Sequence, residues 1–544
     1  MGFLRQGVVP RAYQSAIAAS ALQNGNTLCV LPTGMGKTLI AFLLMGERLK
    51  SGRVAFLAPT RPLVAQHQKS FLELTETPEE STALITGEIS PKKRKELWAR
   101  QVCFSTPQSL KNDLLAKRAD AGFSLVIIDE AHRAVGNYAY TFVAEKCAET
   151  GALLLGLTAS PGGSRKRIQE IVDALCIQNI EIRTAEDADV APYMKRLDIS
   201  YVHVPLGESF TEARNLLSEM LSDYSDSLSA FGMHVPFRSK KALVELRMKI
   251  MRLSEKHRYA ALSLYSSIFN VAHMLELIET QGPLPFLSYV EKMAARPDTK
   301  ARHRVFADQR FITALDICKS APMHPKLERL ISILRERKGQ KILVFAQYRD
   351  SVQSIVSALR QSGFSSERFV GKKDGVKADE QKATISRFSK GEFDVMVATS
   401  IGEEGLDIPS VDTVVFFEPI PSEIRSIQRR GRAGRLKAGS VIVLMATGTR
   451  DEGHFHSSKK KEENMRRIVF RMQRQFSPAS RADDMKHASK AVIAQDEKGH
   501  GGRMHLDPMI PKYKSKPENS PPGALLGDSD VLIKKGKQSK ITDF

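Results

Sequence analysis

The amino-acid sequence predicts an α/β protein with two parallel-sheet domains, a helical domain between them and a disordered C-terminal tail. Residues 1–189 and 325–475 both alternate short β-branched apolar runs with helical patterns. Continuous apolar runs separated by helices are typical of parallel strands buried on both faces. Residues 190–324 lack such runs, and residues 476–544 are rich in Lys, Gly, Pro, Ser and Asp, a composition that disfavours a packed core.

The apolar runs give the expected strands of each sheet domain. In the first domain they are Thr27–Leu31, Arg53–Ala58, Val102–Ser105, Ser124–Ile128 and Ala152–Leu157. In the second domain they are Ile342–Ala346, Val395–Thr399, Thr413–Glu418 and Ser440–Ala446. A charged helix from Glu452 to about Gln475 is expected to follow the last strand.

The middle region, residues 190–324, is expected to be mostly helical. No Gly or Pro occurs between Pro236 and Gly282, and apolar residues recur at helical spacing at Leu243, Leu246, Ile250 and Leu253. The same region carries a cluster of cations that includes Arg247, Lys249, Arg252 and Lys256. On a helix such a cluster is either a solvated face or a phosphate-binding face.

Composition narrows the possible functions. Of 544 residues, 42% are apolar and 26% charged, as in ordinary globular proteins. No apolar run approaches the roughly 18–20 residues of a membrane span, and no signal peptide is evident, so we expect a cytoplasmic protein without a membrane partner. The five scattered cysteines indicate neither a disulfide framework nor a zinc site. The net charge of +20 favours polyanionic partners, nucleic acid first.

A phosphate-binding loop is predicted at residues 32–38, Pro-Thr-Gly-Met-Gly-Lys-Thr, between a strand and an apolar helix. Backbone N–H groups around Thr33, Gly34 and Gly36 can approach the phosphates of ATP, and the helix N-terminus adds a positive dipole. Lys37 is expected to reach the β- and γ-phosphates and Thr38 to hold Mg²⁺. The broad consensus has a glycine where this chain has Leu31.

The segment Asp129-Glu130-Ala131-His132 ends a predicted strand. A carboxylate at the tip of a buried strand beside the loop can hold the Mg²⁺ shell, which is the role expected of Asp129 together with Thr38. The next carboxylate, Glu130, can orient or deprotonate the attacking water.

An arginine-rich segment follows in the second sheet domain, at residues 428–435, Gln-Arg-Arg-Gly-Arg-Ala-Gly-Arg. Arg432 and Arg435 suit bidentate contact with a γ-phosphate, and such arginine fingers neutralise charge in phosphoryl transfer. Taken alone, the segment could also be a basic loop.

The ordered motifs resemble those of a superfamily 2 helicase over nearly all of residues 1–475. The resemblance implies two RecA-like domains, with adenine read by Arg11 and Gln14, and Thr158-Ala159-Ser160 coupling hydrolysis to domain movement. It implies nucleic-acid contacts by Ala58-Pro59-Thr60-Arg61, Thr86-Gly87 and Thr106-Pro107-Gln108, of which Arg61 and Thr106 are the candidate contact residues. In the second domain it assigns motifs to Phe345–Tyr348 and to Ala398–Pro409. In the latter motif, Thr399 would contact the nucleic-acid strand and Asp407 the nucleotide. It also implies that Gln428 is a catalytic residue.

Within that superfamily the chain resembles most closely the archaeal Hef helicase and its relatives, the Fanconi anaemia M-type translocases. The helical insert, Phe369-Val370-Gly371, residues 419–428 and the spacing of the arginine-rich segment carry this resemblance, and the last favours DNA over RNA. It implies that residues 1–189 bind ATP, that residues 190–324 bind branched DNA and that residues 325–475 form the helicase C-terminal domain. The phosphate-binding interpretation of Arg247, Lys249, Arg252 and Lys256 follows from it, as does a nucleoid-associated place in a prokaryotic or archaeal cell.

Many Hef proteins continue into a nuclease with a Glu-Arg-Lys signature. Glu336-Arg337-Lys338 is present here without the upstream Gly-Asp, so we expect no nuclease and leave any cutting to a separate structure-specific nuclease. The C-terminal residues resemble a sliding-clamp interaction box, in which Gln538, Ile541 and Phe544 would bind the clamp from a flexible tail.

These observations predict an ATP-dependent DNA helicase or translocase that acts on branched DNA. An RNA helicase of the sensor or Dicer branch and a non-catalytic, clamp-recruiting scaffold are the alternatives. The presence of Lys37, Asp129, Glu130, Arg432 and Arg435 argues against a dead ATPase.

Overall fold

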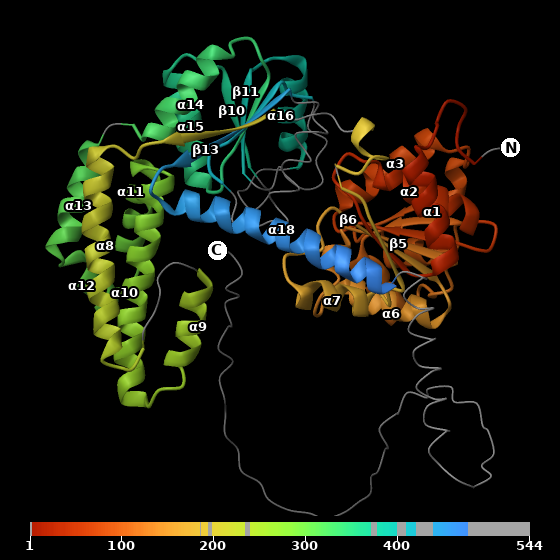
Figure 1. The fold of residues 1–544 in the computed structure, drawn as a ribbon, viewed down its shortest axis with the longest axis horizontal. Coiled ribbons are helices and arrows are strands. Elements are labelled where there is room, and N and C mark those ends of the chain that lie inside the picture. The colour runs from red at the N-terminus through yellow and green to blue at the C-terminus, as the bar shows by residue number, and fades with distance from the viewer. Residues whose placement is uncertain are drawn as a thin grey trace, which may run out of the picture. The chain divides into compact units, whose positions relative to one another are not determined.

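The computed structural model describes residues 3–184, 186–193, 198–233, 240–321, 323–370, 378–399, 410–419 and 439–476. They form two parallel sheets with a helical bundle between them in the sequence, which confirms the predicted fold class (Figure 1). The predicted tail beyond Phe476 lies outside the described residues.

The first sheet has seven strands in the order β3-β4-β2-β5-β6-β1-β7, all paired in parallel. The strands are β1 (Thr27–Val30), β2 (Val54–Leu57), β3 (Thr82–Ile85), β4 (Val102–Ser105), β5 (Leu125–Asp129), β6 (Leu153–Thr158) and β7 (Asn179–Ile182). All the strands that the sequence predicts in this domain form. The sequence does not signal β3 and β7, which are edge strands and need a less continuous apolar run.

Helices cover both faces of this sheet. One face carries α1 (Ala12–Asn24), α2 (Lys37–Arg48) and α3 (Arg61–Leu74), and the other carries α4 (Pro91–Leu97), α5 (Pro107–Leu115), α6 (Ala139–Glu149) and α7 (Arg165–Ala174). Successive residues of β5 serve opposite cores: Leu125 and Ile127 face the first group, and Val126 and Ile128 face the second. This two-sided burial explains why the strands are uninterrupted apolar runs.

The second sheet has six parallel strands in the order β10-β11-β9-β12-β13-β8. The strands are β8 (Asp198–Val204), β9 (Ile342–Phe345), β10 (Ser366–Phe369), β11 (Val395–Ala398), β12 (Thr413–Phe416) and β13 (Ser440–Ala446). Its described helices are α14 (Pro325–Glu336), α15 (Arg349–Gln361) and α16 (Ala378–Lys390). β8 falls in the range that the sequence assigns to the helical insert, yet it pairs with β13 at the sheet edge. Because β8 is largely exposed, its alternation lacks a strong apolar signal.

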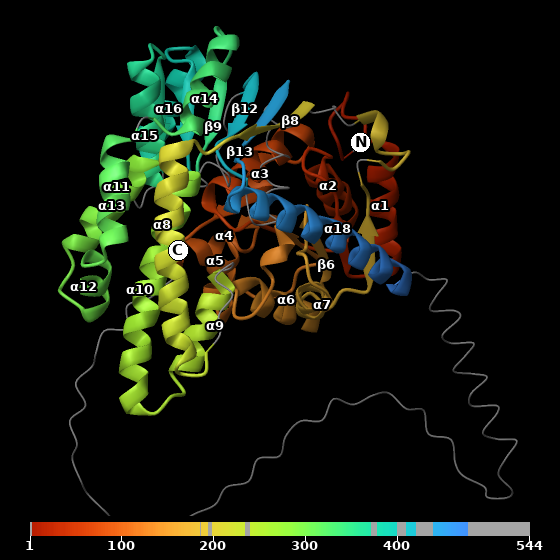
Figure 2. The same cartoon turned by 60° about the vertical axis from the view of Figure 1, so that its left-hand side comes forward.

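The helical insert of the structure therefore begins at Glu208 rather than at residue 190. It comprises α8 (Glu208–Ser229), α9 (Lys240–Ile250), α10 (Glu255–Thr280), α11 (Pro283–Ala294), α12 (Lys300–Phe306) and α13 (Gln309–Ser320). Figures 1 and 2 both show α8 and α10 side by side along the bundle, with α9 at the end away from the second sheet.

Helix α10 corrects the expectation that no segment approaches the length and apolar composition of a membrane span. Among the described residues it is the one helix long and apolar enough, by length and composition, to cross a membrane. Its apolar residues, among them Ile268, Val271, Met274 and Ile278, are buried in the core of the bundle. Its composition is therefore accounted for by burial within the bundle.

The predicted charged helix is α18 (Arg450–Phe476), which follows β13. Its stripe of Met465, Val469 and Met472 is buried in the hydrophobic core of the first domain. Residues of the segment that the sequence assigns to the second domain thus complete the core of the first.

Candidate ATP site and nucleic-acid contacts

The phosphate-binding loop joins β1 to α2, as predicted. Gly36 begins α2 in a left-handed conformation (φ 70°), and Gly34 also has a positive φ (85°). A Cβ on Gly36 would lie 2.3 Å from the side-chain Nε2 of Gln14, so that side chain would have to move, and the positive φ also favours glycine there. The Lys37 ammonium donates hydrogen bonds to the carbonyl oxygens of Leu31 (2.9 Å) and Pro32 (3.2 Å), within the loop it would serve.

Hydrogen bonds join the predicted adenine-reading segment to this loop. Gln14 accepts a hydrogen bond from the Arg11 backbone N–H (2.9 Å) and donates one to the carbonyl of Met35 (3.2 Å). The Tyr13 hydroxyl donates to the same carbonyl (2.7 Å). The Arg11 guanidinium lies 4.5 Å from the ring centroid of Tyr193, an aromatic neighbour that no sequence motif indicates.

Asp129 and Glu130 stand at the carboxyl end of β5. Glu130 has a left-handed backbone (φ 51°, ψ 49°), a conformation that costs a non-glycine residue about 1–3 kcal/mol and is concentrated at active sites. Its carboxylate lies 3.3 Å from Nδ1 of His132. The Asp129 carboxylate lies 3.0 Å from Nε2 of His67.

His67 is a partner of Asp129 that the sequence does not reveal. It lies on α3, the helix that begins at the predicted contact residue Arg61, and it packs on the Phe56 ring with centroids 4.4 Å apart. It is separated from Asp129 by 62 residues in the chain, so only the packing of α3 on the sheet brings them together. A hydrogen bond to a carboxylate fixes the orientation of that carboxylate, so His67 would orient Asp129 for the predicted Mg²⁺ shell.

Tyr140 holds the same strand end from the other side of the sheet. Its hydroxyl donates to the backbone carbonyl of Asp129 (2.7 Å). Burial raises the pKa of Tyr140 well above its usual value, with a further contribution from the nearby Asp129 carboxylate. The hydroxyl therefore stays protonated and keeps donating at ordinary pH.

The coupling motif, residues 158–160, reaches both the carboxylates and α18. The Thr158 hydroxyl lies 3.3 Å from Nδ1 of His132 and accepts a hydrogen bond from the Ser160 backbone N–H (3.1 Å). The Ser160 hydroxyl in turn donates to the Met465 sulfur of α18 (2.9 Å). A contiguous set of contacts thus connects the Asp-Glu-Ala-His segment to the helix that follows the second sheet.

These parts meet because β5, β6 and β1 are neighbours in a parallel sheet, and ligands bind at the carboxyl edge of such sheets. The residues fit Mg·ATP: glycines that allow close backbone approach, Lys37 for phosphate charge, and the hard oxygen donors Thr38 and Asp129 that Mg²⁺ prefers. Thr38 and Asp129 would hold the Mg²⁺, which would supply positive charge against the negative charge that develops in phosphoryl transfer.

The predicted contact residues of the first domain also follow strand ends. Arg61, which begins α3 after β2, forms an ion pair with Glu88, which follows the Thr86-Gly87 motif. Two of the predicted contact motifs are therefore brought together. Thr106 caps α5 and is buried, with its hydroxyl 2.9 Å from that of Ser109. Thr399, after β11, is also buried.

Several predicted site residues lie outside the described residues. They are Asp407, Gln428, Arg432 and Arg435 in the second domain, and Gln538, Ile541 and Phe544 at the C-terminus.

The four predicted cations of the insert are exposed, as either interpretation of the cluster requires. Arg247, Lys249, Arg252 and Lys256 lie on α9, on the turn after it and on the start of α10. No ion pair joins any of them to another described residue, whereas Arg310 of the same bundle pairs with Asp308 (2.9 Å).

Glu336-Arg337-Lys338 lies where α14 ends. Glu336 pairs with Arg329 (3.8 Å) and Arg337 (3.6 Å) at the surface end of α14. Among the described residues, no group of three or more His, Cys, Asp or Glu side chains could hold a metal ion.

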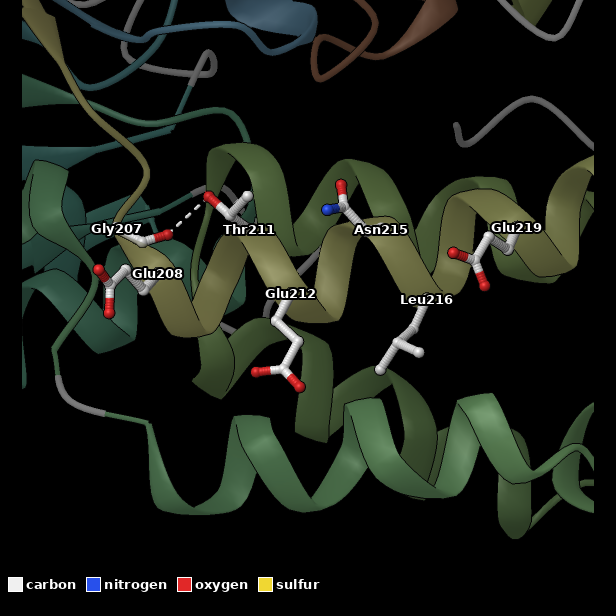
Figure 3. A pocket seen from close by; sticks show the side chains of 7 residues that line it. All are labelled: Gly207, Glu208, Thr211, Glu212, Asn215, Leu216 and Glu219. Carbon is white, nitrogen blue, oxygen red and sulfur yellow. Dashed lines mark hydrogen bonds between the residues drawn. The ribbon is translucent and has the colours of Figure 1, made fainter.

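A shallow hollow of about 600 Å³ along α8 is not part of the candidate site (Figure 3). Its lining residues are Gly207, Glu208, Thr211, Glu212, Asn215, Leu216 and Glu219. Three carboxylates and no cation in this lining would repel the phosphates of nucleotides and nucleic acids.

Three family models, matched along the chain, define the class of protein as the helicases. Residues 7–163 match a family model described as the res subunit of type III restriction enzymes. Residues 209–321 match one described as the helical bundle of a putative ATP-dependent RNA helicase, and residues 325–437 match the helicase conserved C-terminal domain.

Known proteins narrow the class further. The crystal structure of the Hef helicase domain from Pyrococcus furiosus is 42% identical and superimposes with a TM-score of 0.67, covering 84% of this chain and 100% of that one. A putative ATP-dependent RNA helicase of Methanocaldococcus jannaschii is 40% identical over 477 residues, 85% of this chain and 61% of its own length. The ATP-dependent DNA helicase mph1 of Neurospora crassa is 33% identical over 84% of this chain and 43% of its own length.

The chain belongs to the superfamily 2 helicases of the Hef and FANCM type. It spans about three fifths of the length of the M. jannaschii relative and about two fifths of the length of the N. crassa relative.

Proposed function

We propose that this protein is an ATP-dependent DNA helicase or translocase that acts on branched DNA, such as stalled forks and junctions, in fork repair and recombination. The observation that carries the proposal is the row of exposed cations on α9 and the start of α10, which have no ion-pair partner among the described residues. The name of the N. crassa relative, a DNA helicase, supports the choice of DNA.

The insert is bonded to the second domain where α10 ends. The Tyr348 hydroxyl, in the Phe345–Tyr348 motif, donates to the Glu276 carboxylate (2.7 Å). Arg450, at the start of α18, lies 3.8 Å from Glu276 and 3.6 Å from Glu279. The Ser351 hydroxyl donates to the Gln281 side chain (2.5 Å). Because these groups are mostly buried, movement of the second domain would carry the insert and its cations with it.

Burial shifts the pKa values of two side chains at this junction. Burial and the Glu276 carboxylate raise the pKa of Tyr348, so its hydroxyl remains a donor. Burial also raises the pKa of Glu279, against the opposite pull of Arg450. Removing one partner would leave the others buried without compensation, which is the costly way to break such a network.

In the hydrolytic step, Lys37 binds the β- and γ-phosphates, Asp129 and Thr38 hold the metal shell, and Glu130 orients the attacking water. Gln428, Arg432 and Arg435 complete the site from the second domain in this proposal. Glu130 lies 3.3 Å from His132, which lies 3.3 Å from the Thr158 hydroxyl, and these contacts support a coupling of hydrolysis to domain movement.

An RNA helicase is the competing function, because the M. jannaschii relative and the matched helical-bundle model carry RNA helicase names. ATPase stimulation measured side by side with single-stranded DNA, duplex, fork, four-way junction and RNA would decide. The proposal expects the largest stimulation with fork or junction DNA. Stimulation by RNA that exceeds stimulation by every DNA would overturn it, and no stimulation by any of them would favour the non-catalytic scaffold.

Two partners belong to the same proposal. Gln538, Ile541 and Phe544 would bind a sliding clamp, and a separate nuclease would cut the processed branch. The pattern Gln-x-x-Ile-x-x-Phe and the neighbouring lysines support the clamp partner. The protein would work in the cytoplasm, on the nucleoid.

A further inference from the structure

The outward face of α9 carries apolar side chains where a solvent-facing helix would carry polar ones. Val244, Met248 and Met251 are 58%, 56% and 53% exposed, and we call these three residues the α9 stripe. Met251 continues the helical hydrogen bonding, because its N–H donates to the carbonyl of Arg247 (3.1 Å). At 3.6 residues per turn the three side chains fall within about 60° of one another.

The opposite face of α9 explains how the helix is held. Leu243, Leu246 and Ile250 are buried in the core of the bundle. The α9 stripe is therefore not needed to attach α9, and it points away from the bundle core.

Cations border the α9 stripe. Arg247 lies on α9 within about 80° of the middle of the stripe, and Arg252 follows Met251 in the turn after α9. Lys249 and Lys256 add charge beside Arg252 and on the first turn of α10. All four are exposed, and none is ion-paired with another described residue.

This combination selects a ligand with both negative charge and apolar surface. An intact duplex offers phosphates but hides the faces of its bases, so the cations would be used and the α9 stripe would not. A branch point interrupts stacking and exposes base faces between two rows of phosphates. Apolar side chains, methionine included, can insert between the base steps of a duplex at the cost of unstacking them, and at a branch point that cost is lower because stacking is already interrupted.

We propose that the α9 stripe packs against nucleobase faces exposed at a DNA branch point, while Arg247 and Arg252 hold the phosphates on either side. The inference rests on the proposed function and adds to it the origin of branch preference. Phosphate contacts position a protein without distinguishing one duplex from another, whereas the α9 stripe has a ligand only where the stack is broken.

The test uses the full chain and the triple variant Val244→Gln, Met248→Gln and Met251→Gln. Glutamine keeps helix propensity and similar length while removing the apolar surface. Leu284→Gln is the matched control, because Leu284 is 57% exposed on α11 of the same bundle. Affinity is measured for a three-way fork and for a blunt duplex with the same number of phosphates, with 2-aminopurine at the branch point reporting base stacking.

We expect the triple variant to bind the fork roughly tenfold more weakly, an effect of the size expected when a partly buried apolar surface is removed. Duplex affinity and the salt slope should stay as in the wild-type chain, since every cation that binds phosphate is retained. The change in 2-aminopurine fluorescence on binding should disappear, and Leu284→Gln should change nothing.

Three results would overturn the inference. Unchanged fork affinity would show that the α9 stripe contacts no base, and an equal loss for fork and duplex with a changed salt slope would assign it to phosphate binding. Loss of self-association by the variant in sedimentation, with fork affinity intact, would assign the α9 stripe to a second copy of this chain. If the wild-type chain shows no preference for the fork, the proposed function itself fails, before any variant is compared. Met248→Gln alone provides a second variant if the triple variant unfolds.

Discussion

The ATP site of the first domain and the outer face of α9 satisfy their polar groups in opposite ways. Around Asp129 and Glu130, side chains from α3, α6 and β6 supply hydrogen-bond partners from within the chain. On α9 the cations have no ion-pair partner among the described residues. The first region therefore positions its own groups by contacts within the chain, whereas the exposed cations of the second are accessible to a ligand.

The largest effect should come from breaking the first region. Lys37→Ala should lower ATP turnover on the order of 100–1,000-fold, as loss of a charge-stabilising donor does, while leaving DNA binding in place. Glu130→Gln should reach a similar loss with ATP still bound and DNA held more tightly. A steady-state ATPase assay and nucleotide binding measure both.

Lys50→Ala serves as the control, because Lys50 is an exposed lysine just beyond α2 that pairs only with Glu47 among the described residues. Wild-type turnover in either active-site variant would contradict the assignment of the ATP site.

The second prediction concerns the cations on α9 and the start of α10. Reversing Arg247, Lys249, Arg252 and Lys256 to Glu should weaken fork binding and flatten its salt dependence, by about one unit of slope for each phosphate that is no longer neutralised. Basal ATPase without DNA should survive, because these residues belong to the helical insert and not to either sheet domain. Titrations at several salt concentrations provide the measurement.

Arg310 of the same bundle is paired with Asp308 and Asp223, in contrast to the four cations of this variant. If the quadruple variant keeps the fork affinity and salt slope of the wild type, the cluster is only a solvated face.

The third prediction concerns the contact between His67 and Asp129 in the ATP site. His67→Ala should weaken Mg²⁺-dependent nucleotide binding on the order of tenfold, since the group that orients Asp129 is removed. His67→Gln, which can still donate a hydrogen bond, should recover part of it. Binding of a fluorescent ADP with and without Mg²⁺ separates this positioning role from a general loss of stability, which would weaken both titrations alike.

The sequence predicts the parts of the site that are contiguous in the chain. The loop at residues 32–38 and the Asp-Glu-Ala-His segment are recognisable because their chemistry requires fixed spacing. His67 and Tyr193 escape prediction because their contacts depend on the packing of α3 and on the path of the chain after β7.

The same limit applies to the fold. The apolar runs of buried strands identify β1, β2 and β9, whereas the exposed edge strand β8 has no such run and falls in the range that the sequence assigns to the insert. The stripe of Met465, Val469 and Met472 on α18 has visible helical spacing, yet spacing alone does not say that the first domain receives it. Local patterns predict elements, and long-range partners need the structure.

The smallest effect on ATPase activity should come from changes at the C-terminus. As on α9, apolar side chains with neighbouring cations are predicted to bind a partner there. Changing Ile541 and Phe544 to Ala should abolish binding to a sliding clamp in a titration. Burial of two such side chains contributes roughly 1.5–3 kcal/mol each, less the cost of ordering a flexible segment, so the wild-type affinity should be about micromolar. DNA-stimulated ATPase on short oligonucleotides should stay unchanged, because the change lies far beyond α18 in the chain. Clamp binding that persists in the double variant would show that the C-terminal pattern is not the anchor, and would leave α9 as the apolar–basic surface to test for this partner.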